Sequence, residues 1–227
     1  MQFKEGLKTG IPIALGYFSV SMAYGLSAVL LGFDPIQAAL ISVTNLTSAG
    51  QFAGTGILAA GGTLMELATA TLIINARYFL MSLSLSQKLD NCGFFKRLLV
   101  AYGVTDEIFA AAIGQKGRLS FSFMMGLILL PVLGWTGGTL TGALASDLLP
   151  ADVAAACGVA MYGMFIAILV PAARQSRQVS ACILIAAALS ILLQRAGLSS
   201  GWAIIVVTIA AAGFMAWRHP EAGHELD

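Results

Sequence analysis

The feature that constrains this chain most is the length of its stretches without a charged residue. A helix needs about 20 apolar residues to cross the roughly 30 Å hydrocarbon core of a bilayer. Five uncharged stretches reach that length, with 25, 31, 28, 21 and 22 residues; they lie between Lys8 and Asp34, Asp34 and Glu66, Arg118 and Asp147, Asp152 and Arg174, and Arg195 and Arg218. The chain is therefore expected to fold within a membrane.

Composition excludes the main alternatives to a membrane protein. Of the 227 residues, 58% are hydrophobic and 10% are charged, against about 25% charged in an ordinary soluble domain. A disordered chain needs low hydrophobicity and high charge. A nucleic-acid binder needs a basic excess, whereas the net charge here is +1. Three cysteines, an odd number, do not form a disulfide scaffold: Cys92, Cys157 and Cys182.

The same stretches predict an all-α, polytopic helical bundle made of a single transmembrane domain over residues 1–227. We expect about eight hydrophobic segments, six of them without charge, at 10–33, 36–60, 64–87, 98–115, 119–146, 153–173, 178–194 and 200–217. Short loops join them, which leaves no room for a soluble domain. No small-residue cleavage site follows the first apolar core, so we expect that segment to be retained as a helix.

Basic residues indicate the topology, because cytoplasmic loops of membrane proteins are rich in Lys and Arg. The loops around Asp34 and 147–152 have none, and the basic clusters are Lys4/Lys8, Lys88/Lys96/Arg97, Lys116/Arg118, Arg174/Arg177 and Arg218. If all eight segments crossed, the cluster at 88–97 would lie outside. The conflict disappears if 36–60 and 98–115 each enter the membrane and return to the same side. The N-terminus is then cytoplasmic.

The centre of segment 36–60 supports a broken helix. Residues Ser42–Gly56 read SVTNLTSAGQFAGTG, which is polar and rich in glycine. Broken backbone at membrane depth is tolerated only where protein or a water-filled cavity satisfies it. The alternative is a continuous helix that packs inside the bundle through small residues.

A weak internal repeat is also indicated. Pro12 precedes an apolar segment that ends at Asp34-Pro35, and Pro131 precedes another that ends at 147–150. Transporters are often built from such repeats.

Three charged residues lie inside apolar segments, where each is a candidate for function. Arg77 lies eleven residues from Glu66 and Lys88, and a central arginine in lipid is costly unless it is paired or faces a cavity. It contacts either a substrate carboxylate or a structural partner on another helix.

Asp106 and Glu107 are adjacent, so both cannot face one partner. One of them can pair with Arg77 while the other takes a proton or an ammonium group. The alternative is an amphipathic helix on the membrane surface with both acids in water.

Polar side chains crowd the middle of segment 36–60. Asn45, Thr47, Ser48 and Gln51 lie beside Gly50, Gly54 and Gly56. Amide and hydroxyl groups next to glycines suit a polar substrate held against bare backbone. The spacing of Gly50 and Gly54 also fits plain helix packing.

The remaining motifs indicate packing rather than chemistry. Gly134, Gly138 and Gly142 repeat every four residues, which lets another helix approach, within the chain or from another subunit. Trp135 is interpreted as an interface or packing residue.

His219 and His224 lie in the tail and the cysteines lack metal-ligand spacing, so no metal site or cofactor is expected. No Walker-type loop occurs, so we expect no nucleotide hydrolysis. Adjacent Asp106 and Glu107 do not resemble a catalytic pair, and we expect no enzymatic activity.

Three motifs in order resemble the AzlC-type branched-chain amino acid permeases. They are SAGQFAG at Ser48–Gly54, NARYFLMSLSL at Asn75–Leu85 and TDEIFA at Thr105–Ala110, preceded by a K-E-G-x-K-x-G-x-P start at Lys4–Pro12. The resemblance covers nearly the whole chain. It marks as typical of the family Ser48, Gln51, Asn75, Arg77, Asp106 and Glu107. This chain has Tyr78 where relatives often have histidine, which weakens a proton relay there.

The resemblance implies a secondary transporter of the bacterial inner membrane that exports valine, leucine, isoleucine and sometimes methionine together with a small AzlD-type membrane subunit. We expect Asn45, Ser48, Gln51, Asn75 and Arg77 to bind substrate. We expect Asp106 and Glu107 to couple transport to protons or to form an ion pair. Two alternatives remain: a passive channel for small solutes, and an assembly subunit whose partner carries the substrate path.

Overall fold

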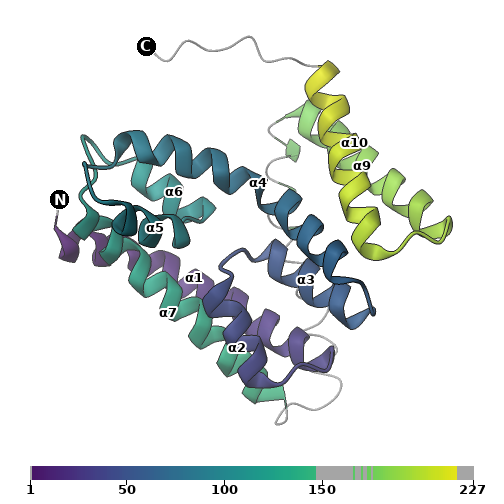
Figure 1. Ribbon diagram of the computed structural model, residues 1–227, viewed down its shortest axis with the longest axis horizontal. Coiled ribbons are helices and arrows are strands. Elements are labelled where there is room, and N and C mark those ends of the chain that lie inside the picture. The colour runs from purple at the N-terminus through teal and green to yellow at the C-terminus, as the bar shows by residue number, and fades with distance from the viewer. Residues whose placement is uncertain (1, 147–165, 167–169, 171–172, 175, 219–227) are drawn as a thin grey trace.

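The computed structural model describes residues 2–146, 166, 170, 173–174 and 176–218, and within them the chain is α-helical without strands. Among these described residues, four helices are long and apolar enough to cross a membrane, namely α1, α4, α7 and α9. The expected all-α membrane bundle is confirmed. The helices of Figure 1 are α1 (Phe3–Leu30), α2 (Pro35–Thr44), α3 (Ala49–Ala59), α4 (Leu64–Lys88), α5 (Phe94–Tyr102), α6 (Asp106–Ile113), α7 (Phe121–Ala145), α9 (Arg177–Arg195) and α10 (Ser200–Arg218).

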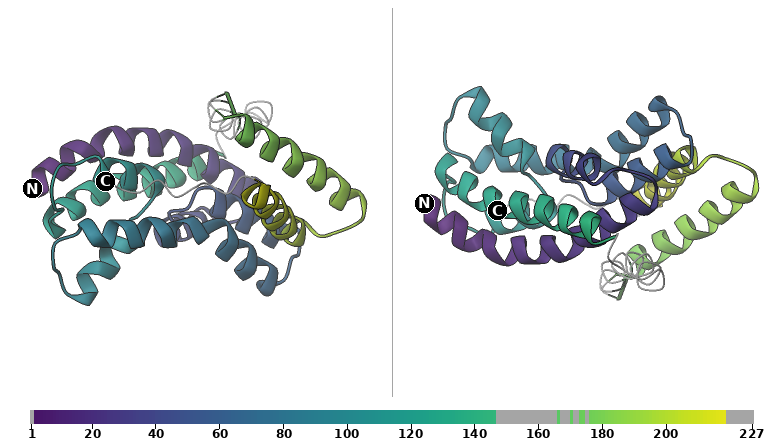
Figure 2. Two further views of the ribbon diagram at one scale, coloured as in Figure 1. Left: turned by 90° about the horizontal axis from the view of Figure 1, so that it is seen from above. Right: turned by 90° about the horizontal axis from the view of Figure 1, so that it is seen from below.

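Helices α1 and α7 form a tightly packed parallel pair, which Figures 1 and 2 show side by side. Residue numbers increase in the same direction along both helices. Gly134 faces Ala14, Gly138 faces Phe18 and Ser21, and Gly142 faces Met22. From α1, Gly6 and Gly25 face the α7 backbone in return. Because both helices present glycines, their backbones approach closely. The partner of the glycine repeat thus lies within the chain.

Two of the expected segments are interrupted helices. In segment 36–60, α2 ends at Thr44 and α3 begins only at Ala49. In segment 98–115, α5 ends at Tyr102 and α6 begins at Asp106, after Gly103. The Thr105 side chain caps α6, and Asp34 followed by Pro35 caps α2, whereas Ser48 makes no side-chain cap at the start of α3.

The chain returns to the same end after each interrupted segment. Helix α4 ends where α7 begins, since Leu119 N donates to Lys88 O at 2.9 Å and Arg118 pairs with Asp90 at 3.2 Å. The α5–α6 segment therefore leaves and rejoins one end of the bundle. Because α1 and α7 are parallel, α4 runs opposite to both, and α2–α3 must likewise leave and rejoin the other end. In Figure 1, α2 lies on α1 and α7, and α3 lies on α4.

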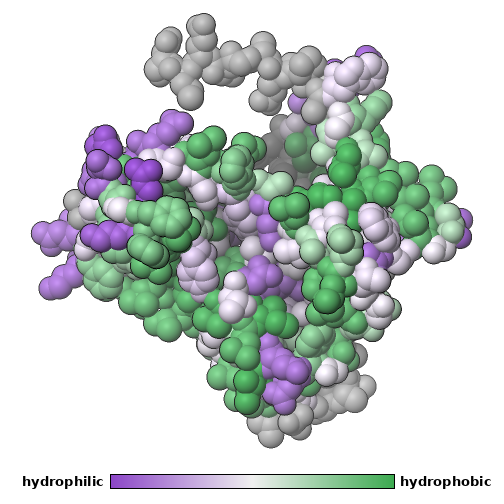
Figure 3. Space-filling view, viewed as in Figure 1, coloured by the Kyte–Doolittle hydropathy of each residue, from purple (hydrophilic) through white to green (hydrophobic). Residues whose placement is uncertain are grey.

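The surface matches this arrangement. Figure 3 shows polar residues gathered over the end where α4 stops and α5 and α6 lie, while apolar residues cover much of the remaining face. Leu72, Phe79 and Leu80 of α4 expose 72%, 72% and 65% of their surface, which suits contact with lipid or with another membrane segment.

Two helices begin before the hydrophobic segments to which they correspond. Helix α1 begins at Phe3 rather than at 10, and α5 begins at Phe94 rather than at 98. The early turns of these two helices contain the charged residues Lys4, Lys8, Lys96 and Arg97. Segments delimited by charged residues therefore begin after the helices do. Segments 178–194 and 200–217 correspond to α9 and α10. Several other predictions fall outside the described residues: most of segment 153–173, the end of the second repeat half at 147–150, Cys157, His219 and His224.

Candidate functional site

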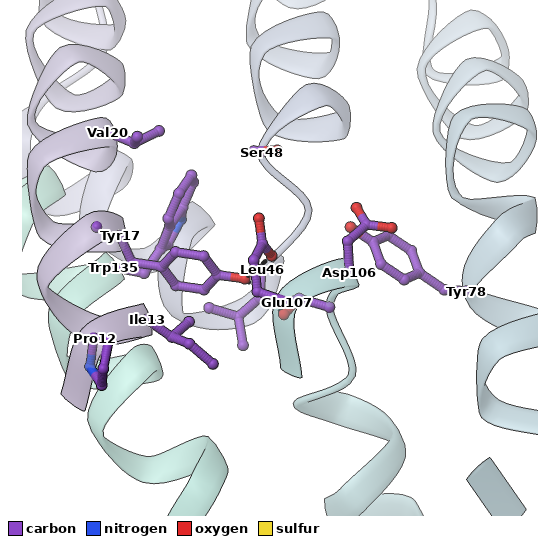
Figure 4. Close-up of a pocket in the computed structure, with 12 residues that line it drawn as sticks. Pro12, Ile13, Tyr17, Val20, Leu46, Ser48, Tyr78, Asp106, Glu107 and Trp135 are labelled. Atoms are coloured by element: carbon purple, nitrogen blue, oxygen red, sulfur yellow. Dashed lines mark hydrogen bonds between the residues drawn. The ribbon is translucent and has the colours of Figure 1, made fainter. Parts of the chain in front are cut away.

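A cavity of about 530 Å³ opens between α1, α4, α6 and the break that separates α2 from α3 (Figure 4). This volume lies within the usual range for a small-molecule site. One wall is apolar and comes mainly from α1, and the other carries hydroxyl and carboxylate groups. The lining residues are Pro12, Ile13, Gly16, Tyr17, Val20, Leu46, Ser48, Tyr78, Thr105, Asp106, Glu107 and Trp135.

The first turn of α6 brings two carboxylates into this cavity. The break at Gly103 lets α6 begin beside α1 and α4 rather than at the end of the bundle. Thr105 caps the helix, and its hydroxyl lies 3.4 Å from Ile108 N. Asp106 and Glu107 occupy the first turn, where the positive end of the helix dipole favours negative charge.

Asp106 forms an ion pair that joins α6 to α4. Its Oδ2 lies 2.8 Å from Arg77 Nη2, and the two side chains are 39% and 46% exposed. The Arg77 guanidinium also lies 5.1 Å from the centre of the Tyr78 ring. The pair is therefore fixed in position but accessible to a ligand.

Glu107 has a different set of partners. The Tyr17 hydroxyl donates to Glu107 Oε2, and the same Tyr17 oxygen lies 2.6 Å from Thr105 Oγ1. Figure 4 shows the Tyr17 ring reaching from α1 to Glu107. In the part of the chain that the structure describes, no Lys or Arg lies within ion-pair distance of Glu107. The two adjacent acids are thus separated, one held by a cation and one by a hydroxyl.

Gln51 lies behind the cavity wall and not in the wall itself. It is 1% exposed, accepts a hydrogen bond from Trp135 Nε1 at 2.7 Å and donates to Ser42 Oγ at 2.9 Å. Ser42 in turn lies 2.7 Å from Thr139 Oγ1. Gln51 therefore holds the Trp135 ring and ties α3 to α2 and α7.

The other predicted polar residues gather around the α2–α3 break. Ser48 lines the cavity, whereas Asn45 and Asn75 do not. Asn45 Oδ1 accepts from the Thr47 hydroxyl at 2.8 Å. A Cβ at Gly50 would lie 3.1 Å from the Asn75 amide, so these two residues pack closely. Of the seven predicted site residues, Ser48, Asp106 and Glu107 line the cavity, and Arg77 reaches it through Asp106.

Nine of the twelve residues that line the cavity were not predicted as site residues, and Tyr17 and Trp135 are among them. Tyr17 had no signal, because a tyrosine in an apolar segment is typical of any membrane helix. Trp135 was interpreted as an interface or packing residue. It is 3% exposed, and its ring packs edge-on against Tyr17 at a centroid distance of 5.3 Å.

Comparison with known proteins identifies the family. Residues 12–149 match the sequence profile described as AzlC protein. The chain belongs to the AzlC family. The AzlC match runs from Pro12 in α1 to the end of α7, so it contains every residue that lines the cavity.

Individual relatives support this assignment. The chain is 35% identical to the inner membrane protein YgaZ of Escherichia coli (strain K12), over 80% of this chain and 76% of the relative. It is 30% identical to an uncharacterized membrane protein of Archaeoglobus fulgidus, over 74% and 75%. It is 27% identical to the branched-chain amino acid transport protein AzlC of Bacillus subtilis (strain 168), over 62% and 56%. No solved structure matches the chain. The chain is therefore a membrane protein of a transport family.

Proposed function

We propose that this AzlC protein exports branched-chain amino acids, and sometimes methionine, across the bacterial inner membrane through the cavity beside α6. The observation that supports this most is the presence around one cavity of an ion pair, an apolar wall and a carboxylate that has no cation partner among the described residues. The branched-chain transport protein among its relatives points to the same substrate class.

The cavity offers a complementary group for each part of the substrate. A zwitterionic amino acid needs a cation for its carboxylate, an acceptor for its ammonium group and an apolar surface for its side chain. In this proposal Arg77 attracts the carboxylate, with the Ser48 hydroxyl at the start of α3 as a further donor. Glu107 accepts the ammonium group. Ile13, Val20 and Leu46 contact the aliphatic side chain.

The same geometry suggests a coupling mechanism. The proton gradient drives export if a proton and the substrate ammonium group compete for Glu107. Release of the amino acid outside then allows Glu107 to accept a proton, which is carried inward. Tyr17 holds the carboxylate toward the cavity in both steps. The small AzlD-type subunit is proposed as the partner of this chain.

The test is export from cells loaded with branched-chain dipeptides. The chain is expressed alone and with its small partner, and internal and external amino acids are followed with and without a protonophore. We expect the cells to export amino acids against their concentration gradient, and we expect this export to stop when the protonophore is added. Export that never exceeds the gradient would indicate a passive facilitator. No difference from the empty vector in either condition would reject the proposed substrate class.

The proposed topology is tested by cysteine labelling. Single cysteines replace Leu31, Ala60 or Lys116 in a background without native cysteines, and intact cells are treated with a membrane-impermeant maleimide. We expect Leu31→Cys and Ala60→Cys to be labelled from outside, because α2–α3 returns to the end it leaves. Lys116→Cys should react only after permeabilisation, since the basic end is cytoplasmic. Labelling of Leu31→Cys and Ala60→Cys from opposite sides would show that α2–α3 crosses the membrane.

A further inference from the structure

Gly16 lies in the middle of the apolar wall of the cavity. The α1 residues that line the cavity are Pro12, Ile13, Gly16, Tyr17 and Val20. Their spacing places them on one face of the helix, with Ile13 and Val20 about one turn on either side of Gly16. Gly16 is thus the position on this face where no side chain enters the cavity.

Helix packing does not account for this glycine. A Cβ added at Gly6, Gly10 or Gly25 would meet the backbone of α7 closely, which explains why those positions are glycine. A Cβ added at Gly16 would have no atom within 4 Å. Close approach of another element therefore does not require glycine at this position.

Backbone conformation does not require it either. Gly16 lies inside α1 and is absent from the described glycines with positive φ, which are Gly32, Gly61, Gly117 and Gly197. Glycine inside a helix is less stable than alanine. The missing side chain has one remaining structural consequence, which is the space it leaves in the cavity.

We infer that Gly16 determines which side chains the transporter accepts, by leaving room for the branched or long end of the substrate. This inference rests on the proposed function. Glu107 and Arg77 hold the polar end of the amino acid on the opposite wall, so the side chain points toward α1. Ile13 and Val20 bound the space along the helix, and Leu46 bounds it from the α2–α3 break. Each carbon added at position 16 shortens the side chain that fits.

The experiment measures export of alanine, valine, leucine, isoleucine and methionine by the parent chain and by Gly16→Ala and Gly16→Val. One methylene in an apolar pocket changes discrimination by about 10- to 200-fold. We therefore expect Gly16→Val to lower the export of leucine and methionine relative to alanine at least about tenfold, with Gly16→Ala intermediate. The matched control is Gly137→Val on α7, which also has no atom within 4 Å of an added Cβ but does not line the cavity. It should leave the ratios unchanged.

A second readout tests the position without relying on export. Gly16→Cys in a chain without native cysteines should react with a small maleimide, and excess leucine should slow that reaction. The membrane content of each variant is measured, so that a folding defect is not taken for selectivity.

The outcomes separate the two proposals. If the parent chain exports none of these amino acids, the proposed function is rejected, and the inference about Gly16 is rejected with it. If the parent chain exports them and Gly16→Val lowers all of them equally, the proposed function stands and the inference about Gly16 is wrong. The same holds if leucine does not slow labelling of Gly16→Cys.

Discussion

Replacing Glu107 by glutamine is expected to lower export of branched-chain amino acids at least about 30-fold and to remove its sensitivity to a protonophore. Glutamine keeps the size of the side chain and can still accept from the Tyr17 hydroxyl, so the link between α1 and α6 is retained. What is lost is the negative charge. Loss of one partner of a desolvated charge pair costs about 2–5 kcal/mol, which corresponds to roughly 30- to 4,000-fold in binding.

The adjacent acid gives a comparison within the same turn. Asp106→Asn leaves Arg77 without its 2.8 Å partner, while Glu107 keeps its charge. We expect a changed apparent KM for substrate, because the Arg77 guanidinium shifts, but continued dependence on the proton gradient. The control is Asp90→Asn, which removes an exposed ion pair with Arg118 far from the cavity lining. Such surface pairs contribute about 0–1 kcal/mol, so transport should not change.

Export and its response to a protonophore are measured at equal membrane content. Full activity of both Glu107→Gln and Asp106→Asn would reject coupling through α6. Retained coupling in Glu107→Gln together with lost coupling in Asp106→Asn would reverse the two roles.

The sequence predicts the fold of this chain because charge and hydropathy directly record the cost of placing residues in lipid. That cost explains why the broken segment around Ser42–Gly56 and the oddly placed Arg77 were recognisable. It also explains why α1 and α5 begin at Phe3 and Phe94, before their hydrophobic segments, since helices continue beyond the hydrocarbon core into regions where lysine and arginine are tolerated.

The site was only partly predictable, because its contacts join residues that are distant in the sequence. The adjacency of Asp106 and Glu107 predicts that they take different partners, and Arg77 was a predicted partner. Nothing local marks Tyr17, which lies 90 residues from Glu107 in sequence. The sequence marks Gln51 as a polar residue inside an apolar segment but does not show what its side chain contacts. Whether it faces a ligand or holds Trp135 depends on how α3 packs against α7.

The adjacent glycines Gly137 and Gly138 should respond in opposite ways to a single added methyl group. A Cβ at Gly138 would meet the Phe18 carbonyl oxygen and the Ser21 hydroxyl of α1, whereas a Cβ at Gly137 would meet no atom within 4 Å. The backbone of α1 cannot rotate away as a side chain would, so Gly138→Ala must separate the two helices. Overpacking of this kind costs about 1–3 kcal/mol. Gly137→Ala should be neutral or slightly stabilising, because alanine favours the helix.

The measurement is the thermal stability of each purified variant in the same detergent. A change of 1 kcal/mol shifts the melting temperature by about 2–4 °C in chains of this size, so we expect Gly138→Ala to melt roughly 2–12 °C lower. Equal melting temperatures for the two variants would show that the α1 backbone does not lie close to α7 at Gly138.

The same substitution connects the stability of the helix pair to the site. Tyr17 precedes Phe18 on α1, and Trp135 lies one turn before Thr139 on α7, so the Tyr17–Trp135 ring contact spans the interface that Gly138→Ala would widen. Separation of the helices would move the Tyr17 hydroxyl relative to Glu107, and transport should fall together with stability. In Gly16→Val the helix pair stays intact and only the size of the accepted side chain should change. These two results together would separate the role of Gly138 on α7, which lets the helices approach, from the role inferred for Gly16 on α1, which leaves room for the substrate.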